Sequence, residues 1–192
     1  MLAMQTTPTL PNQADTQLVP FSEGQIGRSI AASQTRVIDR KEHVFCDGDD
    51  ATHIYQVEAG HVCIYRLLAD GRRQVLDFAF PGDFIGLGVV GQHTTNAQAT
   101  ERTRLRSLPL CELRNIVRDD PRLGLALYEA MSKELTSARD LLLSVSHRSA
   151  QERVAGFLLA RSHRNARRGE DADTIVLPMT RADIGDYLGL TI

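Results

Sequence analysis

The chain has 192 residues, of which 42% are apolar and 24% charged, as in an ordinary globular protein with one large or two small domains. Its formal net charge of −2 excludes a protein that binds polyanions through overall charge. The sequence has no signal-peptide pattern and no run of about 18 apolar residues, so we expect a soluble, cytoplasmic protein without membrane contact.

The N-terminal half predicts a short flexible arm followed by a β-rich domain. Residues 1–20 are rich in Thr, Gln, Pro and Asn, which is typical of a flexible segment. Short apolar or alternating stretches then follow at 37–38, 44–45, 54–57, 61–66 and 75–80. Turn residues separate them, notably at 47–50 (DGDD) and at Asp70-Gly71. Many short strands with glycine-containing turns indicate a small antiparallel barrel or jelly roll.

From Pro121 the apolar residues change to helical spacing. Asp119 and Asp120 are placed to cap the start of this helix. Residues of one apolar row recur at alternating intervals of three and four, as in a coiled coil: Tyr128, Met131, Leu135, Ala138, Leu142 and Val145. A second row, Leu123, Leu127 and Ala130, is available to pack on the barrel. Two rows on one helix favour pairing with a second copy, hence a parallel homodimer; a helix buried within one subunit is the alternative.

A basic segment follows this helix. Residues 147–168 contain six arginines and two histidines against one acid, Glu152. This density suits contact with nucleic-acid phosphates, although a solvated helix face explains it too. Ser149 is a candidate cap for the helix, and residues 174–178 (TIVLP) predict a short strand like that in the wing of a winged helix.

The last residues predict a capped helix and a tight turn. Thr180 is a good N-cap with Asp183 three residues later, and Gly189 suits a left-handed C-terminal residue. Ile184, Tyr187 and Leu188 give the helix one apolar face. Thr191 is positioned to cap a second helix. The pattern fits the first half of a helix-turn-helix, and an ordinary amphipathic helix ending in glycine is the alternative.

Metal and redox chemistry find little support. Cys46, Cys63 and Cys111 are far apart and form no C-x-x-C pair, so we expect buried reduced thiols rather than a zinc or iron–sulfur site. A redox role for these thiols is the alternative. The histidines lack the clustered spacing of a cupin-type metal centre. No cofactor, metal or enzymatic activity is expected.

Taken together, these segments resemble the Crp/Fnr family of bacterial transcription regulators over about residues 21–192. The resemblance is carried by residues 80–86 (FPGDFIG) in the barrel and by residues 179–191 (MTRADIGDYLGLT), and it is most like the Fnr and FixK branch. It implies an α+β fold with a cyclic-nucleotide-binding-like jelly-roll barrel at 21–117 after the arm at 1–20. A dimerisation helix at 118–147 and a winged helix-turn-helix at 148–192, truncated before its recognition helix, would follow.

Two departures from the family narrow the function. Members that bind cyclic AMP carry Glu after the glycine matching Gly86 and Arg before a Ser-Ala or Thr-Ala pair. Here Leu87 and Asn96-Ala97 occupy those positions, and no Arg lies between 87 and 101. Oxygen-sensing Fnr members use an N-terminal cysteine cluster, and residues 1–45 contain no cysteine. The resemblance therefore implies a FixK-type regulator that has neither ligand site.

Such a regulator is a non-enzymatic homodimer that binds double-stranded DNA at palindromes of the TTGAT…ATCAA kind and acts with RNA polymerase. It is expected to activate genes of low-oxygen respiration, denitrification or nitrogen fixation. Its base-contacting residues would lie past Ile192. Thr180, Arg181 and Thr191 are the candidate DNA-binding residues, through the cap and phosphate contacts. The alternative function is a sensor with an unidentified small molecule in the barrel.

Overall fold

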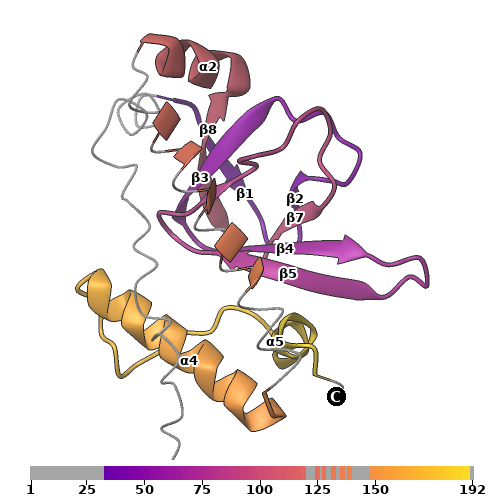
Figure 1. Cartoon of the computed structure of the whole chain (residues 1–192), viewed down its shortest axis with the longest axis vertical. Coiled ribbons are helices and arrows are strands. Elements are labelled where there is room, and N and C mark those ends of the chain that lie inside the picture. The colour runs from indigo at the N-terminus through magenta and orange to yellow at the C-terminus, as the bar shows by residue number, and fades with distance from the viewer. Residues whose placement is uncertain are drawn as a thin grey trace, which may run out of the picture.

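Two four-stranded antiparallel sheets face each other and form the barrel (Figure 1). The computed structural model describes residues 33–119 and 148–190, and between them 124–125, 127–128, 131–132, 135–136 and 138–139. One sheet has the order β1-β8-β3-β6, made of Thr35–Ile38, Thr103–Pro109, His53–Ala59 and Phe84–Ile85. The other has the order β2-β7-β4-β5, made of His43–Phe45, Asn96–Ala99, Val62–Leu67 and Arg73–Ala79. The predicted jelly-roll barrel is thus confirmed.

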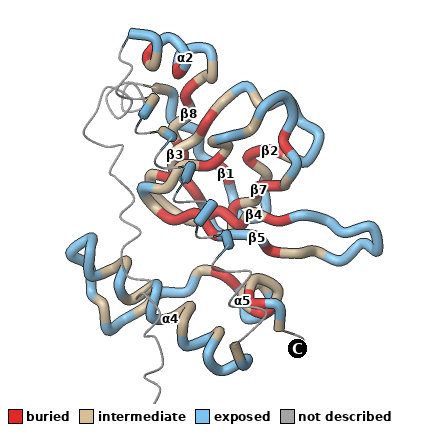
Figure 2. Tube along the Cα trace, viewed as in Figure 1, coloured by how far each residue is buried: buried red, intermediate tan, exposed pale blue. Residues whose placement is uncertain are grey.

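The core of the barrel lies between the two sheets. Val57 and Leu105 from one sheet and Val62 and Ala97 from the other are each 0% exposed and belong to one cluster. Full burial of each Val or Leu side chain is worth about 1.5–3 kcal/mol, which is why these alternating positions fix the register of the strands. Figure 2 shows the buried residues concentrated along the strands.

The hairpin between β4 and β5 forms at the predicted Asp70-Gly71 turn. Gly71 has a φ of +82°, a conformation that glycine adopts without steric cost. The turn is closed by hydrogen bonds from Leu68 N to Arg72 O and from Gly71 N to Leu68 O, at 2.8 and 2.9 Å. The tip of the hairpin extends beyond the barrel, and helix α5 (Arg181–Leu188) packs against strand β5 of the hairpin (Figure 1).

Helix α2 (Leu110–Asp119) was not expected from the sequence, which assigned residues 110–117 to the barrel and 118–119 to the next helix. Leu113 and Ile116 lie three residues apart and are buried against Ile54 and Leu108 of the barrel. Asp119, expected as a cap for the next helix, is instead the last residue of α2. The boundary proposed after residue 117 therefore falls inside a helix.

Described parts of the next helix lie between residues 124 and 139 and are helical. Leu127 of the second apolar row packs against the α2 cluster, as predicted. On the other row, Tyr128, Met131 and Leu135 are 68%, 46% and 53% exposed. Leu123, Ala130, Leu142 and Val145 lie outside the described residues.

Two further helices, α4 (Ala150–Arg167) and α5 (Arg181–Leu188), lie beside the barrel (Figure 1). Ser149 caps α4 in a capping box with Glu152, as predicted. The prediction of a strand at 174–178 is wrong: these residues lie in a loop. No described strand pairs with them, Pro178 has no N–H to donate, and the Thr174 carbonyl accepts from the Asn165 side chain at 3.4 Å.

The three thiols differ in environment. All are free; Cys63 is buried, Cys46 partly buried, and Cys111 exposed on α2, so the expectation of buried thiols is wrong for Cys111. Burial raises the pKa of Cys63 to about 11, although Arg73 donates to its Sγ. Within the described residues, no three His, Cys, Asp or Glu side chains are arranged to hold a metal ion. No described helix has the length and apolar character needed to cross a membrane.

Candidate functional site

The start and end of α5 follow the predicted pattern. The Thr180 side chain accepts from Asp183 N at 3.1 Å, and Asp183 Oδ2 accepts from Thr180 N at 3.0 Å, which completes a capping box. Gly189 closes the helix in the left-handed region at φ +63°. Thr180 and Arg181 are exposed, so both are accessible to a polyanion, while Thr191 lies outside the described residues.

The apolar face of α5 packs on the barrel. Leu188 is 4% exposed, and Ile184 and Tyr187 contact a cluster that includes Phe78 and Phe80 of the barrel and Met179. The rings of Tyr187 and Phe78 lie 5.5 Å apart. Burial raises the pKa of Tyr187 to about 12, so its hydroxyl stays neutral. The exposed face of α5 is therefore fixed in orientation relative to the barrel.

Polar contacts hold the same helix to the β4–β5 hairpin. Arg73 forms an ion pair with Asp183 at 3.2 Å, so the capping carboxylate of α5 is also the partner of a barrel residue. Gln74 donates from Nε2 to the backbone oxygen of Asp186 at 2.6 Å. Sequence reasoning missed both contacts, because nothing local marks residues more than a hundred positions apart as partners.

Arg153 of α4 stabilises the end of α5. Its guanidinium donates to the backbone oxygens of Leu188 and Gly189 at 2.7 and 3.1 Å. The last carbonyls of a helix lack partners within the helix and carry partial negative charge, so a cation there is favourable. Arg153 was predicted only as part of a phosphate-binding segment, and its observed role is to join the two helices.

Three more arginines of this segment contact the barrel: two lie on α4, and Arg168 is the residue that follows it. Arg164 pairs with Asp83, Arg168 donates to the Pro81 carbonyl, and Arg161 lies over the Phe80 ring. Neither interpretation of the segment 147–168, phosphate contact or a solvated face, foresaw these contacts with the barrel, and phosphate contact by the segment stays a prediction. The physical reason for these contacts is that the segment lies against the barrel residues 80–83, which offer a carboxylate, a carbonyl and an aromatic face.

Leu87 and Asn96, which differ from the residues of members that bind cyclic AMP, contact other residues of the protein itself, and so does the nearby His93. Asn96 is 8% exposed, and its Oδ1 accepts from Asp47 N at 3.2 Å. Leu87 packs against the α2 cluster. His93 is 3% exposed and stacks on Phe45 with 3.6 Å between ring centroids. Burial lowers the pKa of His93, which favours a neutral ring and offers no counter-charge for a phosphate.

The predicted dimer interface is the first apolar row of the helix after α2. Its described members are all exposed: Tyr128, Met131, Leu135 and Ala138. Large apolar side chains at regular helical spacing and exposed together are typical of an interface with another chain. The contact itself stays a prediction.

Comparison with known proteins supports one family. The model of the cyclic nucleotide-binding domain matches residues 35–120. The nitrogen fixation regulation protein FixK of Bradyrhizobium diazoefficiens is 40% identical over 151 residues, which cover 79% of this chain and 64% of that protein. The fumarate and nitrate reduction regulatory protein of Yersinia pestis is 33% identical over 157 residues, covering 81% of this chain and 63% of that one. This chain thus spans just under two thirds of the length of these relatives.

A solved structure, FixK2 from Bradyrhizobium japonicum, superimposes with a TM-score of 0.76 at 36% identity, over 83% of this chain and 78% of that one. A cyclic-nucleotide-binding-like barrel with helices beside it is thus the fold class of this chain. The chain belongs to the Crp/Fnr family of transcription regulators, on its FixK branch. These relatives are regulators rather than enzymes.

Proposed function

We propose that the protein is a dimeric, DNA-binding transcription regulator of the FixK kind. The observation that carries the proposal is α5, which has the capping box and the glycine turn of a first helix-turn-helix element and is held at a fixed orientation by Arg73, Gln74 and Arg153. Such a rigid support is what a following recognition helix needs in order to enter a major groove in register.

The dimer is supported by the exposed row Tyr128, Met131 and Leu135. A parallel pairing through this row would bring two copies of α5 to the same end of the assembly. A two-fold protein matches a palindromic site, with half-sites about one helical turn apart. We therefore propose Fnr-type palindromes of the TTGAT…ATCAA kind as targets, and activation of low-oxygen and nitrogen-metabolism genes together with RNA polymerase.

The DNA contacts proposed for this chain are positioning contacts. Thr180 and Arg181 are exposed at the start of α5, where backbone N–H groups and a guanidinium favour a phosphate. Arg161, Arg164 and Arg168 are not among them, because each already contacts the barrel.

The test compares two proteins on two duplexes. The 192-residue chain and the same chain extended by the recognition helix of the FixK relative are titrated with an Fnr-type palindrome and a scrambled duplex, measured by fluorescence anisotropy at fixed salt. We expect the extended chain to prefer the palindrome and the 192-residue chain to bind weakly to both. If the 192-residue chain bound the palindrome more tightly than the scrambled duplex, the proposal that its own DNA contacts only position it would be wrong.

A ligand inside the barrel is less well supported as a second function. The side chains of Val57, Val62, Ala97 and Leu105 fill the space between the sheets. Asn96, which stands where members that bind cyclic AMP hold the phosphate, accepts from Asp47 N instead. Thermal unfolding with cyclic AMP tests it: a large rise in Tm would show that the barrel binds the nucleotide despite Leu87 and Asn96.

A further inference from the structure

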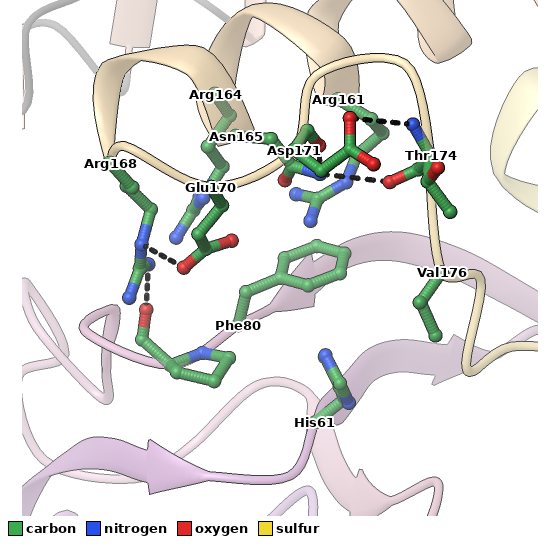
Figure 3. Close-up of a pocket in the computed structure, with 11 residues that line it drawn as sticks. His61, Phe80, Arg161, Arg164, Asn165, Arg168, Glu170, Asp171, Thr174 and Val176 are labelled. Carbon is green, nitrogen blue, oxygen red and sulfur yellow. Dashed lines mark hydrogen bonds and ion pairs between the residues drawn. The ribbon is translucent and has the colours of Figure 1, made fainter.

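A cleft of about 340 Å³ lies where α4 and the loop after it meet the barrel (Figure 3). Its size falls in the range of about 300–1,000 Å³ that small-molecule sites occupy. Barrel residues His61, Phe80 and Pro81 line one side of it. Three arginines line the other: Arg161 and Arg164 of α4, and Arg168 directly after it.

Two of these arginines already have partners. Arg164 pairs with Asp83 at 2.5 Å, with both side chains less than a fifth exposed. Arg168 pairs with Glu170 at 3.1 Å and donates to the Pro81 carbonyl. Their charges are therefore balanced by groups of the protein itself.

Arg161 is different. Among the described residues, no carboxylate lies within ion-pair distance of it, and its buried Nε has no hydrogen-bond partner. Its Cζ lies 3.3 Å from the centroid of the Phe80 ring, which supports the guanidinium from one face. Burial, and then the nearby charge of Arg164, lowers the pKa of Arg161 to about 10, so the group stays charged at neutral pH.

The acids at the rim do not supply the missing partner. Glu170 is engaged by Arg168. Asp171 Oδ1 accepts from the backbone N–H groups of Asp173 and Thr174, which directs it into its own loop (Figure 3). A partly buried cation without an anionic partner is costly, and a bound anion would remove that cost.

We propose that this cleft binds a small phosphate-bearing molecule, with Arg161 as the phosphate ligand. Arg161 lies over the Phe80 ring at 3.3 Å and is the one arginine of this cleft without an ion-pair partner among the described residues. A phosphate offers a guanidinium more charge and more acceptor oxygens than a carboxylate does, so we expect Arg161 to favour the phosphate. Phe80 and Val176 provide an apolar wall for the rest of the molecule. Because the ligand would contact α4 and the barrel together, its binding would fix their relative position. The inference does not depend on DNA binding by the chain.

The test uses the 192-residue protein with inorganic phosphate as the probe and acetate as the comparison anion. Thermal unfolding is followed while chloride keeps the ionic strength constant. We expect a saturable rise in Tm with phosphate and none with acetate. Arg161→Gln should weaken phosphate binding at least tenfold, whereas Arg118→Gln, an exposed arginine on α2, should leave it unchanged.

A second measurement needs no variant. Phenylglyoxal modifies arginine side chains, and phosphate should slow the modification of Arg161, measured by peptide mass spectrometry, without slowing that of Arg118. The proposal is overturned if the phosphate effect does not saturate, if acetate matches it, if Arg161→Gln binds phosphate as tightly as the parent protein, or if phosphate leaves the labelling of Arg161 unchanged.

Discussion

Arg164 of α4 donates to Asp83 of the barrel at 2.5 Å, which joins two residues 81 positions apart in the chain. Asp83 also accepts from the backbone N–H of Phe80 at 2.9 Å, so one carboxylate orders its own turn and holds the helix. The side chains are 19% and 15% exposed, and solvent therefore screens the pair only in part. The contact lies in the residues 80–86 that carry the family resemblance.

Replacing this carboxylate should loosen α4 from the barrel. We expect Asp83→Asn to lower the free energy of unfolding by about 1–3 kcal/mol, because the Arg164 guanidinium would lose its charged partner in a partly buried place. Urea unfolding measures the change. The control is Asp70→Asn, because the Asp70 and Arg72 side chains are 52% and 78% exposed, so losing this pair should lower the free energy of unfolding much less than losing the Asp83 pair. Equal losses in the two variants would contradict the structural role of Asp83.

A charge in the exposed apolar row should prevent association. Leu135 is 53% exposed in the single chain, and we expect Leu135→Glu to raise the dissociation constant of the proposed dimer by on the order of 100-fold, equivalent to about 3 kcal/mol. Sedimentation equilibrium measures it. Thr136→Glu adds the same charge at the next exposed position, off the predicted row, and should have a much smaller effect. If the parent chain stays monomeric at all concentrations, the proposed dimer interface along this row is wrong.

Loss of the α5 cap should destabilise the first turn of that helix. Thr180→Ala removes the oxygen that accepts from Asp183 N, which typically costs about 1 kcal/mol. Faster amide exchange of the first turn of α5 is the expected signature, read by hydrogen–deuterium exchange. Thr180→Ser keeps the oxygen and should preserve the protection; if serine and alanine behave alike, the hydroxyl is not the stabilising group.

His93 should make stability fall as the pH is lowered. Burial lowers its pKa in the folded protein, whereas in the unfolded chain it binds a proton near its ordinary pKa of about 6.5. The unfolded state then holds more protons as the pH falls through that value, so the free energy of unfolding decreases. Urea unfolding between about pH 7.5 and about pH 5.5 should show a steeper decrease for the parent protein than for His93→Gln. Parallel curves would contradict the prediction.

Local features of the fold were predictable, since they depend on neighbouring residues. The Asp70-Gly71 turn, the Ser149 and Thr180 caps and the Gly189 end each arise within a few positions of chain. The alternation of apolar and polar residues predicted the approximate positions of the strands for the same reason. The strand predicted at 174–178 failed because β-branched residues favour extended backbone but form a strand only beside a partner.

Long-range contacts of the candidate site were not predictable. Charge density along 147–168 indicated a binding surface, but nothing in it distinguishes an arginine that contacts DNA from one that contacts Asp83 or the end of α5. Helix α2 was missed because its two buried residues, Leu113 and Ile116, are too few to show a period in sequence. Tertiary packing determines which partner each arginine contacts and where α2 forms, and a single sequence gives little information about that packing.

Arg153 has one further consequence for motion. Because its guanidinium holds the carbonyls of Leu188 and Gly189, α4 and α5 are coupled mechanically and should turn as one rigid body. Any swing of α5 away from the hairpin would then also strain the Arg164–Asp83 pair at the far end of α4. A change in the position of the barrel turn that contains Asp83 would thereby be transmitted through α4 to α5, the helix for which we propose DNA contacts.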